Sequence, residues 1–182
     1  MNLLKFHNKI KGYTQNRQPG IEADMEPKPI AELEEYKAAG KLENKVALIT
    51  GGDSGIGRAI AILYAKEGAN VAIGYYDEHQ DAEDTVNRLQ EMGVKAKAYA
   101  HDLKDEKQSQ KLIKDVINDF GSLNILVNNG GVQFPRDHFE DITPQQVKES
   151  FMTNIFGMMF LSQAAVPYLS EGDTIINTTS VT

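Results

Sequence analysis

The feature that most constrains this chain is a glycine-rich segment, residues 50–57 (TGGDSGIG), between a short apolar run and a helical pattern. Residues 46–50 are typical of a buried strand, and residues 56–67 repeat apolar side chains at helical spacing. Glycine permits tight turns and close backbone approach, and a helix N-terminus attracts anions. The segment therefore predicts a strand-turn-helix unit whose turn binds a phosphate group, with a purely structural turn as the alternative. No Gly-Lys-Ser/Thr follows, which argues against a phosphate loop.

The same alternation continues along the chain. Further strands are predicted at residues 71–75, 96–100, 125–128 and 174–177, with helical patterns between them. A long helix is expected from Pro144, with Thr143 as its cap, toward residue 168. These repeated units predict an α/β fold with a doubly wound parallel sheet, Rossmann-like, with strand order 3-2-1-4-5. Its ligand crevice would lie at the carboxyl ends of the strands.

The first 44 residues differ from the rest. They are polar, are interrupted by Pro19, Pro27 and Pro29, and have no sustained period. We expect an extended N-terminal arm over residues 1–44 and a dinucleotide-binding Rossmann domain over residues 45–182. The arm is either a disordered tail or a segment that packs on the domain or on a neighbouring subunit.

Charge and composition disfavour several classes of protein. The formal net charge is -7, and because residues 1–44 carry seven charges of each sign, the excess lies in residues 45–182. An acidic domain disfavours nucleic-acid binding. The chain has no Cys, and its longest apolar stretch, residues 155–161, is far below the roughly 18 residues of a membrane span. We expect a cytoplasmic protein with no membrane partner.

The four histidines give no metal signal. They have no metal-ligand spacing among them, so we predict no metal site and expect surface or loop positions for them. They are His7, His79, His101 and His138.

Four motifs in order give the chain a family resemblance. Residues 50–57 begin Thr-Gly and end Gly-Ile-Gly, Asp102 follows the third predicted strand, residues 128–131 read Asn-Asn-Gly-Gly, and Asn154 lies in the long helix. The fifth strand then leads to Ser180. Over residues 45–182 the chain closely resembles the short-chain dehydrogenase/reductase family. Its arm is similar to that of a bacterial, stress-associated subgroup with an extended N-terminus.

The resemblance implies a role for each motif. Ser180 would orient a substrate carbonyl and Asn154 would hold a water in a proton relay, so both are candidate catalytic residues. Asp102 would bind the adenine, and Asn128 would support the sheet and the ribose region. The full set of expected cofactor-binding residues is Gly51, Asp53, Ser54, Gly55, Ile56, Gly57, Tyr75, Asp77, Asp102, Leu103, Asn128, Gly130 and Gly131.

Simpler interpretations exist for three of these residues. Ser180 alone reads as a turn residue, Asp102 as a helix cap, and Asn154 as a polar core residue that kinks a helix. The chain also departs from the family pattern, since Gly130 stands where the family has Ala. The family's Tyr-x-x-x-Lys, which supplies the proton to the substrate oxygen, is expected after Thr182, so we expect the C-terminal portion of the domain to be missing from this sequence.

Two hypotheses follow. The first is an NAD(P)-dependent oxidoreductase that acts on a small alcohol or carbonyl, and the alternative is a non-catalytic dinucleotide-binding module. NAD is preferred over NADP because residues 75–78 (YYDE) offer acid and no base where a 2'-phosphate would lie, although Arg58 could reach such a phosphate. Asp77 would be the ribose ligand. A homo-oligomer is expected, a tetramer or dimer that pairs through the apolar helix over residues 155–166.

Overall fold

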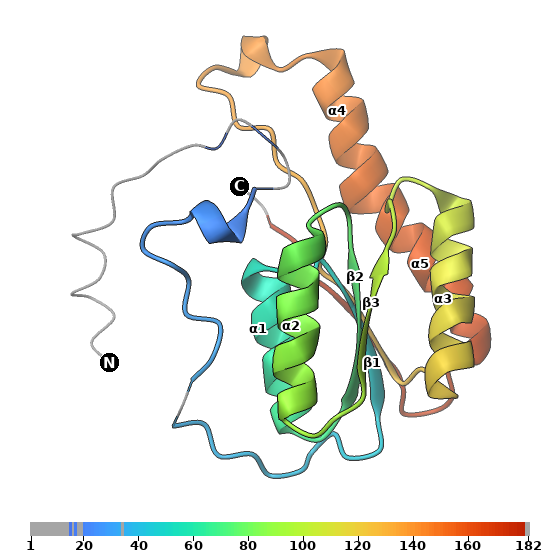
Figure 1. Cartoon of the computed structure of the whole chain (residues 1–182). Coiled ribbons are helices and arrows are strands. Elements are labelled where there is room, and N and C mark those ends of the chain that lie inside the picture. The colour runs from blue at the N-terminus through green and yellow to red at the C-terminus, as the bar shows by residue number, and fades with distance from the viewer. Residues whose placement is uncertain (1–14, 16, 18–19, 34, 181–182) are drawn as a thin grey trace.

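A single five-stranded parallel sheet forms the centre of the molecule (Figure 1). The computed structural model describes residues 15, 17, 20–33 and 35–180. The strand order is β3-β2-β1-β4-β5, which confirms the predicted topology. The strands are β1 (Val46–Thr50), β2 (Asn70–Tyr75), β3 (Ala96–Ala100), β4 (Ile125–Asn128) and β5 (Thr174–Asn177).

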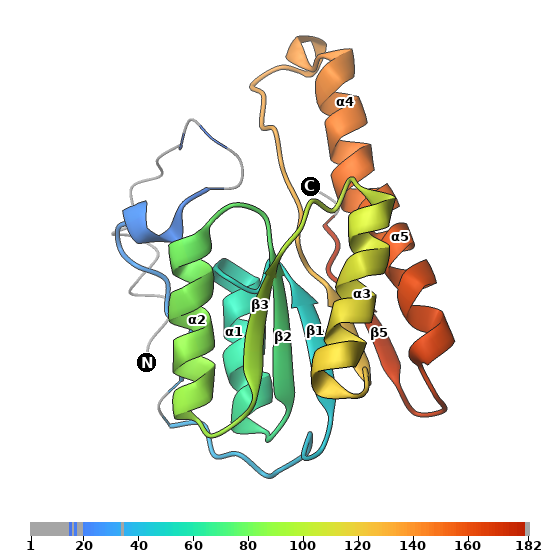
Figure 2. The same cartoon turned by 45° about the vertical axis from the view of Figure 1, so that its right-hand side comes forward.

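Helices cover both faces of this sheet (Figure 2). One face carries α1 (Gly55–Lys66) and α2 (His79–Glu91), and the other carries α3 (Glu106–Phe120) and α5 (Gly157–Ala165). The middle strand β1 shows how the sequence divides between the two cores. Ala47 and Ile49 pack with α1 and α2, whereas Val46 and Leu48 pack with α3 and α5. Side chains alternate across a strand, so a continuous apolar run is what a sheet covered on both faces requires.

Local signals fix the ends of the helices. The Asp105 side chain caps α3 by accepting hydrogen bonds from the amides of Lys107 and Gln108, and Gly121 ends the helix in the left-handed region. Thr143 forms a capping box with Gln146 at the start of α4 (Pro144–Phe151). The cap predicted for the long helix is confirmed.

The long helix is not uniform. A π-helical turn, η4 (Met152–Phe156), separates α4 from α5, and a 3₁₀ turn, η5 (Val166–Tyr168), ends it. Its extent toward residue 168 was predicted, but the π turn was not. Such turns are frequent at functional sites, and this one carries Asn154.

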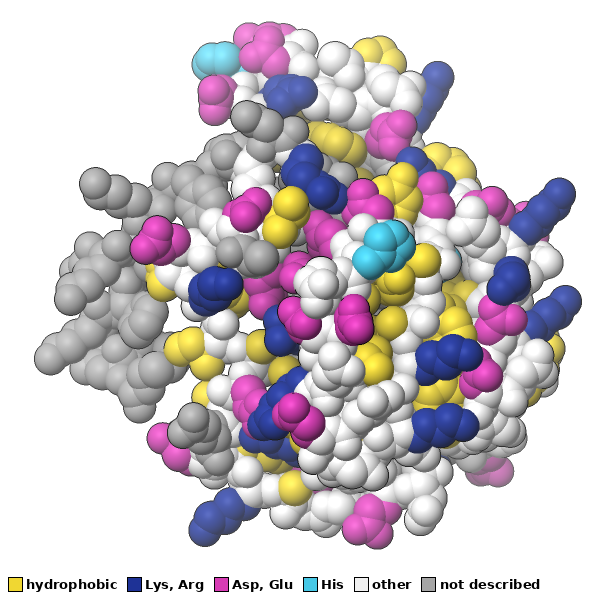
Figure 3. All heavy atoms as spheres, viewed as in Figure 1, with side chains coloured by type: hydrophobic (Ala, Val, Ile, Leu, Met, Phe, Trp, Pro, Cys, Tyr) yellow, Lys and Arg dark blue, Asp and Glu magenta, His cyan; other side chains and the backbone are white. Residues whose placement is uncertain are grey.

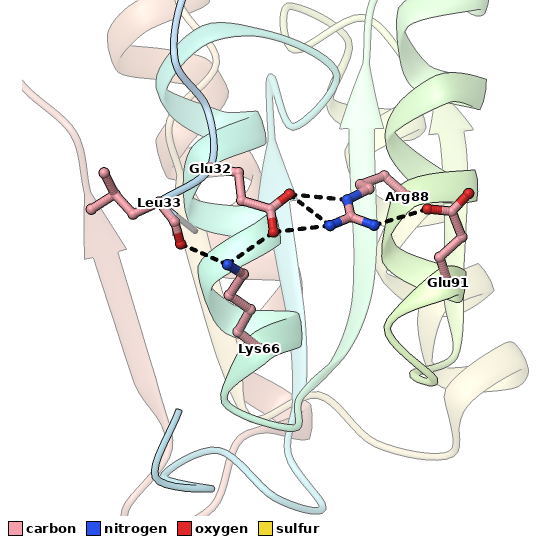
Figure 4. A network of polar contacts seen from close by, with 5 residues as sticks. All are labelled: Glu32, Leu33, Lys66, Arg88 and Glu91. Atoms are coloured by element: carbon pink, nitrogen blue, oxygen red, sulfur yellow. Dashed lines mark hydrogen bonds and ion pairs between the residues drawn. The ribbon is translucent and has the colours of Figure 1, made fainter. Parts of the chain in front are cut away.

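The described part of the arm packs against the same chain. Glu32 accepts hydrogen bonds from Arg88 of α2 at 2.9 and 3.0 Å and pairs with Lys66 of α1 at 2.9 Å (Figure 4). Lys66 also donates to the backbone carbonyl of Leu33 at 2.8 Å. One carboxylate thus joins the arm to both helices on this face of the sheet.

A second anchor lies nearer the domain. Glu67, just after α1, accepts hydrogen bonds from the Tyr36 hydroxyl and from the backbone amides of Ala39 and Lys41. Its own carbonyl accepts from the amide of Leu42 at 3.0 Å. Of the alternatives offered by the sequence, a disordered tail or a packed segment, residues 20–33 and 35–44 therefore show a segment packed on the domain of the same chain.

The molecular surface is mixed in charge. On the face seen in Figure 3, Lys and Arg side chains are scattered among Asp and Glu rather than gathered in a stripe. No helix in the described part of the chain has both the length and the apolar character needed to cross a membrane.

Candidate functional site

The glycine turn between β1 and α1 is closed by backbone contact. Gly51 and Gly55 have φ values of 60° and 52°, which other residues rarely adopt. A Cβ on Gly57 would lie 1.9 Å from the carbonyl oxygen of Gly51. The first and last glycines of the motif are therefore required for the turn to fold back on the first turn of α1.

The turn is tied to the end of the neighbouring strand β4. The Thr50 hydroxyl accepts hydrogen bonds at 3.0 Å from the amides of both Asn129 and Gly130. The Asn129 side chain donates back to the carbonyl of Thr50 at 3.2 Å. Sequence reasoning did not assign these roles to Thr50 and Asn129, although the second Asn of the Asn-Asn-Gly-Gly motif was the available signal.

A cavity of about 920 Å³ opens at the carboxyl ends of the strands. Its walls come from the segments that follow the five strands, from α4 and η4, and from the arm. Ten of the thirteen residues expected to bind a cofactor line it: Gly51, Asp53, Ser54, Gly55, Ile56, Tyr75, Asp102, Leu103, Gly130 and Gly131.

The other three expected residues lie outside the lining. Gly57 supports the turn from within α1, as described above. Asn128 is buried and donates hydrogen bonds to Ser162 at 3.1 Å and to Asn177 at 2.8 Å, so it joins β4 to α5 and β5. Asp77 is 47% exposed in its side chain and pairs with Arg17 of the arm at 2.9 Å.

The segment after β3 brings four residues to the cavity, His101, Asp102, Leu103 and Lys104. Asp102 accepts a hydrogen bond from the amide of Lys104 at 2.9 Å. The helix cap belongs to Asp105, so the alternative interpretation of Asp102 as the cap of α3 is wrong.

His101, which also lines the cavity, is buried rather than at the surface. Its ring packs on the backbone of β2, where a Cβ at Gly74 would lie 2.6 Å from the ring. Burial lowers the pKa of His101 to about 4, so the ring is neutral at physiological pH. The expectation was a surface or loop position, and His101 does lie in a loop. Its ring is nevertheless buried, because Gly74 leaves room for it.

Acidic groups gather between the glycine turn and the end of β2. Burial raises the pKa of Asp53, and burial together with contact with Asp53 raises the pKa of Glu78 to about 7. Arg17 lies 3.5 Å from Glu78 and opposes that rise. On the other side of the turn, Glu22 of the arm accepts a hydrogen bond from the amide of Gly55 and pairs with Arg58 at 3.0 Å.

The two candidate catalytic residues occupy different positions. The Asn154 side chain accepts from the amide of Val132 and donates to its carbonyl, both at 2.8 Å, so it holds the loop after β4. Its neighbour Thr153 lines the cavity. Ser180 is exposed in the segment after β5, two residues beyond Thr178, which also lines the cavity. In the described part of the chain, His, Asp and Glu form no cluster able to hold a metal ion.

Comparison with known proteins identifies the class to which this fold and cavity belong. The family described as short chain dehydrogenase matches residues 45–182, and the chain belongs to this family. General stress protein 39 of Bacillus subtilis is 47% identical over 179 residues, covering 98% of this chain and 63% of that protein. Glucose and ribitol dehydrogenase of Daucus carota is 42% identical over 175 residues, covering 92% and 60%.

A solved structure supports the same fold. The short chain dehydrogenase from Burkholderia cenocepacia J2315, in complex with NADP, matches with a TM-score of 0.74 and 36% identity over 78% of this chain and 57% of that one. The chain thus spans about three fifths of the length of the proteins it matches.

Proposed function

We propose that the chain forms the dinucleotide-binding part of an NAD(P)-dependent oxidoreductase that transfers hydride between the nicotinamide ring and a small alcohol or carbonyl compound. The observation that carries the proposal is the cavity at the carboxyl ends of the strands, with the glycine turn and the N-terminus of α1 in its wall. A diphosphate suits this wall, because glycines allow close approach and the helix end favours anions. Membership of the family argues against the alternative of a non-catalytic module.

The chain's own residues then have distinct tasks. Backbone amides of the turn other than those of Gly52 and Gly55, which bond to the Gly74 carbonyl and the Glu22 carboxylate, bind the diphosphate, and Asp102 and Leu103 bind the adenine side of the cofactor. Asn154 fixes the loop after β4 through Val132 and thereby shapes the region where the nicotinamide would lie. Ser180 orients the substrate oxygen. When bound, the nicotinamide cofactor supplies or accepts the hydride.

The proton needs a separate donor. No Tyr-x-x-x-Lys follows Ser180 within residues 1–182. We assign the proton transfer to the Tyr and Lys that the family resemblance implies. Ser180 and Asn154 by themselves would support little turnover.

The substrate class rests on the relatives. The carrot protein is named for glucose and ribitol, which supports an alcohol or carbonyl substrate here. The Burkholderia structure contains NADP, which supports a nicotinamide cofactor. Asp77 is half exposed, and as a ligand of the ribose hydroxyls it favours NAD. Its ion pair with Arg17, however, places a basic side chain at this strand end, which the sequence pattern did not reveal.

Calorimetric titration with NADP and NAD tests the proposal, together with the Ser54→Asp variant. Ser54 lines the cavity at the N-cap of α1, where its hydroxyl makes no capping bond, so an Asp is tolerated as a cap but repels a diphosphate. We expect the unchanged protein to bind the dinucleotide with micromolar affinity. The affinity of the variant should be at least about tenfold lower, the effect of roughly one unfavourable charge contact.

Ser170→Asp is the matched control. It adds the same charge before β5, at the amino ends of the strands and so at the opposite end from the cavity, and should bind like the unchanged protein. Absence of binding by the unchanged protein would contradict the proposed function. Binding without turnover in a protein that carries the Tyr and Lys would favour the non-catalytic module.

We also propose a homo-oligomer that pairs through the apolar helix over residues 155–166, which consists of the end of η4, α5 and the first residue of η5. Ile155, Met159 and Val166 are apolar and are 48%, 59% and 59% exposed. Exposed apolar patches of this kind mark interaction surfaces. Light scattering should show a dimer or tetramer, and Met159→Glu should shift it toward monomer. A monomer at micromolar concentration would contradict the proposal.

A further inference from the structure

One cation of the arm reaches the end of β2, across sixty residues of sequence. Arg17 donates a hydrogen bond to Asp77 at 2.9 Å and lies 3.5 Å from a carboxylate oxygen of Glu78. It also lines the cavity, together with Ser54 and Tyr76. Arg17 therefore stands between the acidic strand end and the space that we assign to the cofactor.

This location has a defined chemical meaning in a sheet of this order. The ribose of the adenosine half lies at the end of the second strand, where a carboxylate accepts bonds from the hydroxyls and a basic side chain pairs with a 2'-phosphate. The strand end itself, residues 75–78, carries no base. The two other cations among the described lining residues, Lys104 and Arg136, come from the segments after β3 and β4.

Described residues on either side of Arg17 are held in place. The Gln15 side chain donates to the carbonyl of Ile21 at 2.8 Å and accepts from its amide at 2.6 Å, so Gln15 and Ile21 are joined. Next to Ile21, Glu22 is fixed to the amide of Gly55 and to Arg58. Gln15 and Ile21 are thereby attached to the first turn of α1, beside the proposed diphosphate site.

We infer that Arg17 is a specificity-determining residue that binds the 2'-phosphate of NADP. The inference rests on the proposed function, since it requires the dinucleotide to lie in this cavity. A guanidinium matches the geometry of a phosphate and forms paired hydrogen bonds with it. The ion pair with Asp77 is about half exposed, so this contact is cheap to exchange for a phosphate of higher charge, whereas the 3.5 Å contact with the buried Glu78 is not.

The test compares two nucleotides that lack the nicotinamide, adenosine 2',5'-bisphosphate and adenosine 5'-monophosphate, by calorimetric titration. We expect the unchanged protein to bind the bisphosphate at least about tenfold more tightly, as is typical for one charge-assisted pair. Arg17→Gln should bring the two affinities within about threefold while affinity for the monophosphate stays the same. Arg17→Lys should retain part of the preference, because it keeps the charge but not the paired geometry.

Arg88→Gln is the matched control. Arg88 is also an arginine that anchors the arm, through Glu32, but it does not line the cavity. If Arg88→Gln removed the preference as fully as Arg17→Gln, attachment of the arm rather than phosphate contact would be responsible, and the inference would be wrong. Equal affinities for both nucleotides in the unchanged protein would overturn the inference alone, whereas no binding of either would overturn the proposed function.

Discussion

Three carboxyl groups crowd the turn beside β2: Asp53, Glu78 and Asp81. All three side chains are largely shielded from water, and desolvation is the main cause that raises each pKa. The pKa of Glu78 rises to about 7. Arg17 is the cation that opposes the rise at Glu78, so the charge of this group depends on the arm as well as on the domain.

Glu78→Gln should change how stability depends on pH. A folded pKa above the unfolded value of 4.5 means that the contribution is fully present below pH 4.5 and is lost as pH rises through about 7. The variant lacks this loss, so its stability relative to the unchanged protein should increase between pH 5 and 8, by at most about 1.4 kcal/mol per pH unit. Urea denaturation at several pH values measures it.

Glu83→Gln provides the control, because Glu83 is an exposed carboxylate on the same helix α2. Its effect should not vary with pH over this range. Parallel pH profiles for Glu78→Gln and the unchanged protein would show that Glu78 titrates normally.

Two glycines make contrasting predictions about the turn. An alanine methyl at Gly57 would collide with the Gly51 carbonyl, whereas nothing lies within 4 Å of the Cβ position at Gly93, which is strained only by its φ of 87°. Gly93→Ala should cost about 1–2 kcal/mol of unfolding free energy. Gly57→Ala should cost several times as much and should abolish nucleotide binding. Equal urea midpoints for the two variants would contradict the contact.

The position of a site residue could be predicted where neighbouring residues in the sequence determine it, and could not where a distant residue does. The glycine turn and Asp102 follow predicted strands directly, so their position on the cavity could be read from the sequence. The partner of Asp77 could not, because it is Arg17, sixty residues away in a segment without periodicity. The burial of His101 depends on the missing side chain of Gly74, a contact across strands that no local pattern reports.

At the level of elements, the π turn η4 joins the long helix to the loop after β4. A π turn leaves the regular hydrogen-bond ladder, and here it carries Asn154, whose side chain forms both bonds with Val132. The Asn154 side chain thus makes the pair of hydrogen bonds to the Val132 backbone that a neighbouring strand would make in a sheet. Its place in the π turn agrees with the interpretation of Asn154 as a polar residue that kinks a helix, and its role in a proton relay stays a prediction.

Asn154→Ala should loosen this loop without unfolding the sheet. Loss of two hydrogen bonds predicts a decrease of about 1–2 kcal/mol in unfolding free energy. Hydrogen exchange at the Val132 amide should become faster, while amides of β1 stay protected. Asn87→Ala, an exposed asparagine of α2, is the control and should change neither. Unchanged exchange at Val132 would show that the side chain does not hold the loop.

The elements themselves were predicted well because their signals are local. β1, β3, β4 and β5 have the expected bounds, and the sheet has the strand order of the Rossmann-like fold that the alternating pattern predicted. The π turn escaped prediction because its sequence, MTNIF, keeps the apolar pattern of the helix around it. The spacing of apolar residues indicates which face of a helix is buried. It does not reveal that one helical turn contains an extra residue.

At the scale of the whole molecule, the described part of the arm runs along the α1 and α2 side of the sheet (Figures 1 and 4). Charged side chains at intervals, Glu22, Glu32 and the receiving Glu67, make its polar contacts, and the isolated apolar residues Ala31 and Leu42 pack against the core. Such contacts leave no period in the sequence, which is why its path could not be predicted. They also connect the arm to the turn at one end and to the base of α1 at the other.

Glu67→Gln should release the arm near residues 36–41. The hydrogen bond from Tyr36 and those from the Lys41 and Ala39 amides hold the pKa of Glu67 below its ordinary value, so it is ionised at pH 7 and accepts all three bonds. This stabilisation is present above pH 4.5 and is lost as pH falls through the lowered pKa.

Trypsin cleaves after lysine, and Lys37 and Lys41 lie within the segment. At pH 7 the variant should therefore be cut there several times faster than the unchanged protein, because neutral Gln makes weaker bonds to the amides. Glu91→Gln, which removes an exposed partner of Arg88, should not change the rate. Equal cleavage of all three proteins would mean that Glu67 does not hold the arm to the domain.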